Sequence, residues 1–407
     1  MILPSALSTY LRCTALAAFL AAIATVRIAE AAVSFVGSVN PDPPANGGTF
    51  ATNTTLAIGD GNDSNSNDIR AWLRIDDGTL LQYGRLIVGD EEDYLGEAHV
   101  LGDFLAGKNT QFNFSGSGSF SNPTVQVGSD GIGRLTVSGG STMNATNSSG
   151  NMSIGLNPSG IGHTTITDTF TILTVEDNIF VGQRGIGTLN VLNGALVRTL
   201  DSSASRYIGI GVNTLGVGTV VVDGPGSILR SGSSLVVSGN SVSAPTEFGQ
   251  GTLRISNGGI VDVDNTSSAQ IHVGPLGRIE LSEGTLIGFN PLAGFGTTVR
   301  GYLGGSGLVR GSVEIQRQGF VEANPGQLLR FSGLVENQGS ITVDHGEIWF
   351  LGEMANRAPA IGVPPGRISL ENATIRFSQT LVNNGVISTA AGANNIHGEI
   401  INNERVI

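Results

Sequence analysis

The stretch Val181-Gly-Gln-Arg-Gly-Ile-Gly-Thr-Leu-Asn-Val-Leu-Asn-Gly194 decides the fold of this chain. It joins two features that recur elsewhere: a Val-Gly or Ile-Gly dipeptide, and a short strand between glycines. The dipeptide occurs at residues 58–59, 88–89, 127–128, 154–155, 181–182, 208–209 and 273–274. The four copies from 127–128 to 208–209 are equally spaced. A fixed period with matched apolar positions predicts a repeat protein, in which each unit buries its apolar face only against its neighbours.

The strand between glycines recurs at residues 133–140, 187–194, 218–224 and 251–258. In each copy two apolar residues stand two positions apart, as Leu189 and Val191 do, so both point to one face of a strand. A third apolar pair, Leu196-Val197, indicates about three short strands per unit. We therefore predict an all-β parallel β-helix (β-solenoid) with ~27-residue repeats and coils ~4.8 Å apart. The alternatives, a propeller or a sandwich, would show ~40-residue blades or tight Asn-Gly hairpins.

The composition narrows the classes of partner. The chain has 60 glycines among 407 residues, 13% charged residues and 6% aromatic residues, which favours turn-dense β structure over a bulk core with aromatic anchors. Its net charge is −12 and Lys108 is its only lysine, so we expect no nucleic-acid partner, which would need clustered basic residues.

The order of segments predicts an exported protein. Residues 1–31 have the pattern of a signal peptide: Arg12, an apolar run from Cys13 to Val26, and an Ala-x-Ala site ending at Ala31. The mature chain would then have no cysteine, and no other run is apolar enough for a transmembrane segment. Residues 32–53, rich in proline, are expected to form a linker or an N-terminal cap, and residues 54–299 the Val/Ile-Gly solenoid.

A second repeat family, with the rhythm Val-x-Asn-x-Gly, occupies residues 300–407, for example at 334–339 and 381–385. We expect it to continue the same solenoid with a shifted register. The sequence stops at Ile407 without a polar capping segment, and an open coil exposes unpaired strand edges. We therefore expect either a truncated reading frame or a partner that covers this end.

The motif Gly-Thr-Leu-x-Val-x-x-Gly with a preceding Val-Gly resembles the repeat of bacterial autotransporter passengers and of surface proteins sorted by PEP-CTERM signals. The later Val-x-Asn-x-Gly rhythm is similar to that of extracellular repeat proteins of planctomycete-type bacteria. The resemblance covers about residues 54 to 403 and implies a secreted or surface right-handed β-helix with an adhesive or structural role. The chain departs from these families because it lacks both a membrane translocator barrel and a Pro-Glu-Pro tail.

Three carboxylates are the best candidates for chemistry. Asp60 and Asp90 stand two residues after the Val/Ile of their units and Asp130 three residues after, so stacked coils could bring them together. Calcium takes several such oxygen ligands, and a glycosidase needs two carboxylates roughly 5–10 Å apart. Later units carry Leu156 and Gln183 at this phase, however, and acidic residues are common in turns. We therefore expect no catalytic residue, no metal site and no cofactor.

Other residue types give no site either. The five histidines (His99, His163, His272, His345 and His397) share neither spacing nor phase, so a zinc site is not expected. The only tryptophans, Trp72 and Trp349, lie in strand-like contexts, where packing in the core is favoured over stacking on a sugar.

These observations predict a non-enzymatic, exported rod, structural or adhesive, at the cell surface or in the extracellular matrix. Its expected partners are an extracellular polysaccharide or other surface proteins. The alternative is a polysaccharide-acting parallel β-helix enzyme, a lyase or hydrolase, which would need carboxylates and an Arg or Lys converging on one face over adjacent coils.

Overall fold

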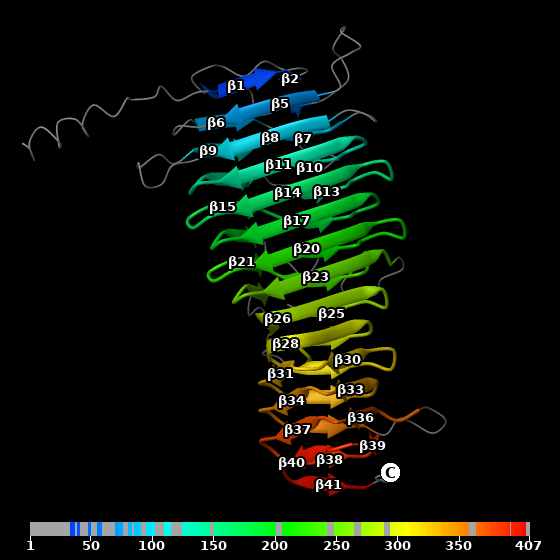
Figure 1. Ribbon diagram of the computed structural model, residues 1–407. Coiled ribbons are helices and arrows are strands. Elements are labelled where there is room, and N and C mark those ends of the chain that lie inside the picture. Colours follow the sequence, from blue (N-terminus) through cyan, green and yellow to red (C-terminus); the bar gives the residue numbers. More distant parts are fainter. Residues whose placement is uncertain are drawn as a thin grey trace, which may run out of the picture.

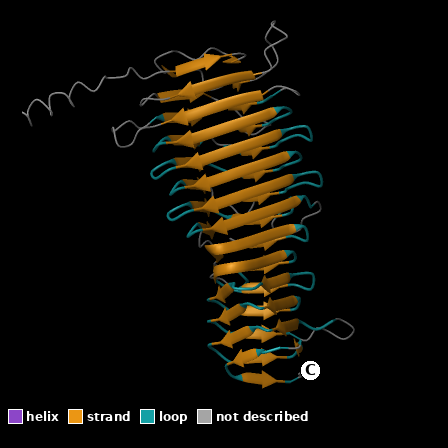
Figure 2. Cartoon of the chain, in the orientation of Figure 1, coloured by secondary structure: helices purple, strands orange, loops and turns teal. Residues whose placement is uncertain are grey.

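The computed structural model describes residues 33–36, 39–40, 48–49, 55–58, 70–75, 80–83, 85–90, 95–101, 110–114, 124–146, 150–200, 206–241, 248–263, 270–288, 294–357, 364–390 and 392–403. The proposed signal peptide, residues 1–31, lies outside these. The described residues form strands and turns without a helix (Figure 2). No helix in this part of the chain is therefore long and apolar enough to cross a membrane.

The strands stack coil upon coil from β1 to β41 (Figure 1), and each coil contributes a strand to three successive rows. The first row, here called the short face, is a 15-stranded sheet. Its members are β2 (Val39–Asn40), β4 (Thr55–Ile58), β7 (Arg85–Val88), β10 (Val125–Val127), β13 (Met152–Ile154), β16 (Ile179–Val181), β19 (Tyr207–Ile210), β22 (Ser234–Val237), β25 (Ile271–Val273), β27 (Thr297–Val299), β29 (Val313–Ile315), β32 (Val335–Asn337), β35 (Met354–Asn356), β38 (Leu381–Asn383) and β41 (Ile400–Asn402).

The other two rows belong to a 26-stranded sheet. One row, the long face, contains β1 (Val33–Val36), β5 (Arg70–Ile75), β8 (Leu95–Leu101), β11 (Ile132–Ser138), β14 (Ile161–Thr167), β17 (Ile186–Leu192), β20 (Val217–Asp223), β23 (Gln250–Ser256), β26 (Gly277–Gly288), β28 (Tyr302–Arg310), β30 (Phe320–Ala323), β33 (Ser340–Asp344), β36 (Arg367–Glu371) and β39 (Val386–Thr389). The other row, the return face, contains β3 (Gly48–Thr49), β6 (Leu80–Tyr83), β9 (Gln111–Phe114), β12 (Thr142–Ala145), β15 (Ile172–Val175), β18 (Leu196–Thr199), β21 (Ile228–Ser231), β24 (Ile260–Val263), β31 (Leu328–Phe331), β34 (Glu347–Phe350), β37 (Thr374–Phe377) and β40 (Asn395–His397). Strands β26 and β28 run through both rows.

Coil-to-coil pairing is parallel and in register along the stack, as between β10 and β13 or between β11 and β14. The prediction of an all-β parallel β-helix is therefore confirmed. At the amino-terminal end, β1 pairs antiparallel with β5 and β2 antiparallel with β4. These two strands cover the edge of the first coil, which reduces the number of unpaired backbone groups there.

The apolar residues of the repeats form one continuous core. Val125 and Val127 of the short face, Leu135 and Val137 of the long face and Met143 of the return face are all essentially inaccessible to solvent. They belong to a cluster that extends from the first described coil to the last. Each coil therefore buries its apolar side chains on the coils above and below it, as expected for a solenoid.

The glycines of the repeat motif are required by the backbone. Gly128 has φ +67°, and a Cβ there would lie 2.3 Å from the carbonyl oxygen of Ile161 in the next coil. A Cβ on Gly133 would lie 2.3 Å from the carbonyl oxygen of Val88 in the coil before. Only glycine combines the left-handed conformation with this close approach of neighbouring coils.

The repeat length is not constant, and one sequence match was wrong. Val181 pairs with Ile210 and not with Ile208, because the coil between them is longer than the regular period. The counterpart of Val181-Gly182 is therefore Ile210-Gly211, whose glycine has φ +65°. Toward the carboxyl end the coils shorten, since Thr297 pairs with Val313 and Val335 with Met354. The solenoid narrows accordingly in Figure 1.

Residues after 300 lie in the same three rows as those before, since β27 pairs with β29 and β29 with β32. The asparagine of the Val-x-Asn-x-Gly rhythm ends each short-face strand and points inward. Asn337, Asn356 and Asn383 are fully buried and hydrogen-bonded in succession, Nδ2 to Oδ1, at 2.9 Å and 2.7 Å. An asparagine ladder thus replaces the Val-Gly corner in the shorter coils.

Candidate functional site

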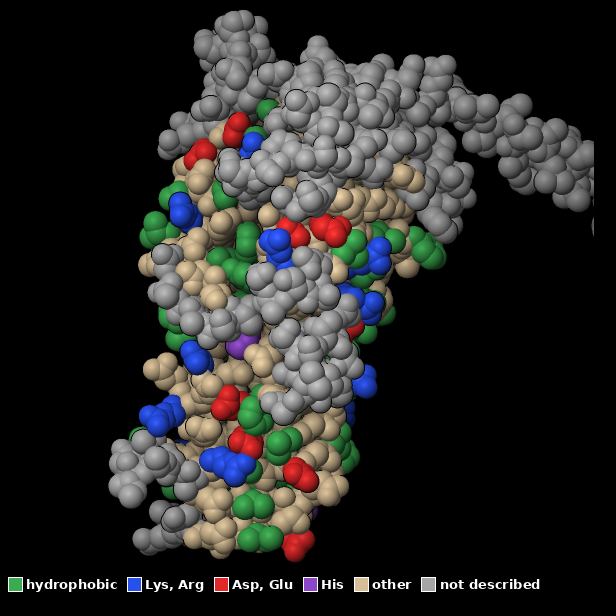
Figure 3. Space-filling view, turned by 180° about the vertical axis from the view of Figure 1, so that it is seen from behind, with side chains coloured by type: hydrophobic (Ala, Val, Ile, Leu, Met, Phe, Trp, Pro, Cys, Tyr) green, Lys and Arg blue, Asp and Glu red, His purple; other side chains and the backbone are tan. Residues whose placement is uncertain are grey.

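The outer side of the short face is the most unusual surface of the solenoid. Its outward positions in register are Ile87, Gln126, Ser153, Phe180, Gly209, Val236, His272, Thr298 and Glu314. Outward-facing strand residues are normally exposed, yet Gln126 and Val236 are only 1% exposed and Ser153 not at all. This outer side is therefore recessed, and two hollows lie along it. In Figure 3, a view from the side opposite to that of Figure 1, the charged side chains drawn in colour are of both signs and lie singly or in small groups.

The first hollow, here called the acidic hollow, has a volume of about 490 Å³. It is lined by Arg85, Ile87, Asp90, Gln126, Ser129, Asp130, Leu156, Asn157, Gln183 and Arg184. The structure thus brings Asp90 and Asp130 to one site, together with Leu156 and Gln183, which hold the same phase in later coils. Asp60 lies outside the described residues.

Hydrogen bonds fix the polar groups of the acidic hollow. Asn157 donates from Nδ2 to Asp130 Oδ2 at 2.9 Å, and the Ser153 hydroxyl donates to Gln183 Oε1 at 2.7 Å. The Nε2 of Gln126 is buried without a partner. Burial lowers the pKa of Arg85, and the neighbouring carboxylate of Asp90 partly opposes this.

A cation site is not formed here by the described residues. Two carboxylates line the acidic hollow, but two arginines line it as well. No group of three or more His, Cys, Asp or Glu side chains that could hold a metal ion occurs in the described ranges. The arrangement instead offers amides, hydroxyls and charges of both signs at one surface, which suits a polar ligand with several hydrogen-bonding groups.

An aromatic pair follows along the short face. The rings of Phe180 and Tyr207 meet edge to face, with centroids 5.4 Å apart. The Tyr207 hydroxyl donates to the carbonyl oxygen of Asn240 at 2.9 Å, and burial raises its pKa to about 12. Tyr207 therefore stays neutral and holds a fixed, partly apolar step in the recessed surface.

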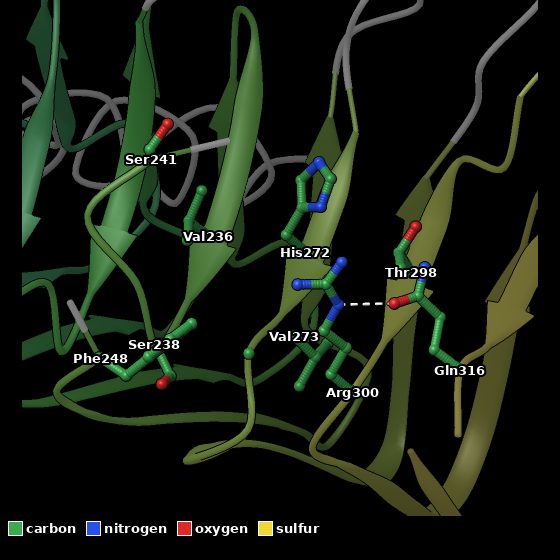
Figure 4. Close-up of a pocket in the computed structure, with 10 residues that line it drawn as sticks. Val236, Ser238, Ser241, Phe248, His272, Val273, Thr298, Arg300 and Gln316 are labelled. Carbon is green, nitrogen blue, oxygen red and sulfur yellow. Dashed lines mark hydrogen bonds between the residues drawn. The ribbon is translucent and has the colours of Figure 1, made fainter. Parts of the chain in front are cut away.

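The second hollow, here called the His272 pocket, has a volume of about 100 Å³ (Figure 4). Its polar lining includes Ser238, His272, Thr298, Arg300 and Gln316, which come from successive coils of the stack. The Nε of Arg300 donates to Gln316 Oε1 at 2.5 Å. Burial, and next the charge of Arg300, lower the pKa of His272 to about 4, so its imidazole is neutral at physiological pH.

Two residues that line the His272 pocket each have a buried polar atom without a hydrogen-bond partner: Ser238 Oγ and His272 Nε2. Ser238 also has φ +70°, in the position that glycine fills in preceding coils at Gly128, Gly155 and Gly182. Non-glycine residues in this conformation are strained by about 1–2 kcal/mol. Strain and unsatisfied polar groups together are typical of functional sites.

The sequence did not point to this pocket. His272 has no periodic partner, because neighbouring coils place Val236 and Thr298 at its position. One signal was present: one regular period after Ile210-Gly211 the chain reads Val237-Ser238 instead of a Val-Gly dipeptide. A serine at a position that demands glycine marks the site once the register is known.

The tryptophan prediction was wrong for Trp349, which lies on the outer side of the return face. It stands in register between Arg330 and Arg376, and its Nε1 donates to the Ser378 hydroxyl at 3.0 Å. Inward positions of β34 are filled by Ile348 and Phe350 instead. The side chain of Trp72 lies outside the described part of the structure.

Comparisons with known proteins give no family. No family model matches the sequence. No curated protein matches it either. Among solved structures, the crystal structure of a TibC-catalyzed hyper-glycosylated TibA fragment has 14% sequence identity and a TM-score of 0.30, over 86% of this chain and 98% of that one. A likeness at this level is too weak to carry an argument about function.

Proposed function

We propose that this chain is an exported, non-enzymatic β-solenoid rod that acts at the cell surface or in the extracellular matrix as a structural or adhesive element. The observation that carries the proposal is the recessed outer side of the short face. There the acidic hollow, the Phe180–Tyr207 pair and the His272 pocket follow one another along a single line of coils. A long polymer with repeating polar groups can lie along such a surface.

Polysaccharide is the polymer that fits this chemistry best. Amides, hydroxyls and single charges match sugar hydroxyls and carboxylates, and an aromatic step offers an apolar surface to a ring face. The export signature of residues 1–31 and the resemblance to bacterial surface repeats support such a partner, because an exported chain would meet extracellular polysaccharide. The net charge of −12 disfavours nucleic acid.

The test is binding and depolymerisation of a panel of acidic and neutral polysaccharides, with and without calcium. We expect binding without shortening of the polymer. Arg184→Gln, in the acidic hollow, should weaken binding, whereas Arg134→Gln removes the same charge from the long face and should not. Failure of every polysaccharide to bind, or equal effects of the two variants, would contradict the proposal.

The second candidate is a polysaccharide-acting enzyme, and one observation favours it. Asp90, Asp130, Arg85 and Arg184 line a single hollow over adjacent coils, which is the convergence that such an enzyme needs. Shortening of a polysaccharide that is abolished by Asp130→Asn would support this candidate and reject the non-enzymatic rod.

A further inference from the structure

Trp349 lies outside the core, on the outer side of the return face. The inward positions of its strand, β34, are filled by Ile348 and Phe350, which are both inaccessible to solvent. Trp349 is partly exposed, and its indole Nε1 donates to the Ser378 hydroxyl of the next coil. An aromatic ring at such a position exposes apolar surface to water, which favours contact with a partner. Because Trp349 does not pack in the core, stacking on a sugar is the role that remains for it.

The neighbours of Trp349 on the adjacent coils are both arginines. Strand β34 lies between β31 and β37 in the stack (Figure 1), and Arg330 and Arg376 stand on these two strands in register with Trp349. We call Arg330, Glu347, Trp349 and Arg376 the Trp349 patch. Strands of adjacent coils lie about 4.8 Å apart. A sugar ring placed against Trp349 would therefore lie within reach of the side chains on both neighbouring coils.

The two arginines of the Trp349 patch differ in their ion pairing. The Nε of Arg376 donates to Glu347, which stands two residues before Trp349 on β34. Arg330 is exposed, and among the described residues no carboxylate lies within ion-pair distance of it. The patch therefore has one uncompensated positive charge, at the position directly beside Trp349.

This arrangement favours an acidic sugar over a protein partner. Charged residues flank Trp349 on both adjacent coils and on its own strand, whereas a stable protein interface has a contiguous apolar core. The apolar side of a sugar ring packs against an aromatic ring, and a guanidinium pairs strongly with an oxyanion. Tryptophan and arginine are also the residues that most often dominate the binding energy of a contact surface.

We infer that the Trp349 patch binds an acidic sugar unit, whose ring lies against the indole of Trp349 and whose anionic substituent pairs with Arg330. Resting on the proposed function, this unit belongs to an extracellular polysaccharide, which the return face contacts in addition to the short face. The hydrogen bond to Ser378 holds the indole before the ligand arrives, which reduces the entropy lost on binding.

The experiment is titration of the purified chain with polygalacturonate and with dextran sulfate, and with unmodified dextran as the neutral polymer. In the variant Trp72→Phe, Trp349 is the only tryptophan, so its fluorescence reports whether the ligand reaches the patch. Calorimetric titration of wild type gives the affinity without a change at Trp72. The test variants are Trp349→Ala and Arg330→Gln. Their controls are Phe170→Ala, at an aromatic side chain that is 60% exposed, and Arg367→Gln, at an exposed arginine of the long face.

We expect an acidic polymer to bind roughly tenfold more tightly than dextran and to change the fluorescence of Trp349. Whether polygalacturonate or dextran sulfate binds more tightly identifies the anionic substituent as a carboxylate or a sulfate ester. Trp349→Ala and Arg330→Gln should each weaken binding roughly tenfold, which is the effect of a dominant contact residue. The two control variants should bind as wild type does. Both test positions lie outside the core, and thermal unfolding of each variant checks that it is folded.

Three results would overturn the inference: equal binding of dextran and the acidic polymers, unchanged fluorescence of Trp349 in the complex, or unchanged affinity in Trp349→Ala. Sedimentation of the chain without sugar tests another occupant. If wild type forms a dimer that Trp349→Ala dissociates, the patch is an interface between copies of this chain and the inference is wrong.

The Arg184→Gln variant separates this inference from the proposed function. If Arg184→Gln weakens polysaccharide binding and Trp349→Ala does not, the adhesive function of the short face stands and the sugar site at Trp349 fails. If Trp349→Ala weakens binding and Arg184→Gln does not, the site at Trp349 stands and the short face is not the adhesive surface.

Discussion

Asn356 donates a hydrogen bond from Nδ2 to Oδ1 of Asn383 at 2.7 Å, and both side chains are completely buried. Asn356 Oδ1 in turn accepts from Asn337 Nδ2 at 2.9 Å, so each amide satisfies the amide of the next coil. Removal of one member takes a hydrogen bond from the amide on either side, although Asn337 Nδ2 also donates to the Arg367 carbonyl and Asn383 Oδ1 also accepts from the Gly385 amide.

Asn356→Ala should lower the free energy of unfolding by about 2–4 kcal/mol, from two lost hydrogen bonds and the partly unsatisfied amides that remain. Urea denaturation and amide hydrogen exchange in β35 and β38 measure the effect. The control is Asn403→Ala, which removes an exposed amide pair with Asn384 at 2.8 Å. If both variants lost the same free energy of unfolding, burial of the asparagine ladder would add nothing to the stability of the protein.

Ser238→Gly should stabilise the protein by about 1 kcal/mol, because glycine adopts φ +70° without the strain that a Cβ causes. The reverse change one coil earlier, Gly211→Ser, should cost roughly 2–4 kcal/mol, since a Cβ there would lie 2.3 Å from the Gln250 carbonyl. Thermal unfolding of both variants tests this. A Ser238→Gly variant less stable than wild type would mean that the packing of the buried serine side chain outweighs the backbone strain.

The fold could be predicted from sequence because single positions in each coil accept only one type of residue. Gly128 has a left-handed backbone, and a Cβ on it would lie 2.3 Å from the neighbouring coil. No other residue type fits such a position, so the dipeptide recurs in the sequence. The register was less secure. Ile208-Gly209 matches the regular period only by coincidence. The coil that follows Val181 is longer than this period, so Ile210-Gly211 occupies the corner instead.

The site was harder to predict, since outward positions carry no periodic pattern. Asp90 and Asp130 were identifiable because they closely follow the repeated dipeptide, and the structure places both at the acidic hollow. Ser238, His272 and Arg300 come from coils of unequal length. A search for constant spacing therefore does not reveal that they line one pocket. The asparagine rhythm was visible, but its inward direction became clear only from the alternation within each short-face strand.

Phe350→Ala should lower the free energy of unfolding by about 3–5 kcal/mol. The Phe350 ring stacks between those of Phe331 and Phe377, with centroids 5.3 Å and 5.4 Å away, and its removal opens a cavity in the core. Chemical denaturation measures the loss. Phe170→Ala, at a side chain that is 60% exposed, should change stability by less than about 1 kcal/mol. A small loss at Phe350 would indicate that adjacent coils close the gap.

His272 should make the folded protein sensitive to acid. Burial and the charge of Arg300 hold the pKa of His272 at about 4 in the folded protein, against about 6.5 in the unfolded chain. The unfolded chain therefore binds more protons below pH 6.5. The contribution of the neutral His272 to the free energy of unfolding is therefore present above that pH. It falls as the pH drops toward 4, and below pH 4 it changes no further. Arg300 is the charged group that acts on the imidazole, and its Nε donates to Gln316, whose Nε2 donates to Glu314.

His272→Gln should remove this part of the acid sensitivity. Between pH 7 and pH 5, wild type should lose about 2 kcal/mol more of its free energy of unfolding than the variant, because only wild type must keep a buried imidazole neutral while the unfolded chain takes up a proton. Urea denaturation of both proteins at a series of pH values measures the difference, and taking the difference cancels the titration of groups that they share. A constant offset between the two curves across this range would mean that His272 titrates normally and that the pocket is open to water.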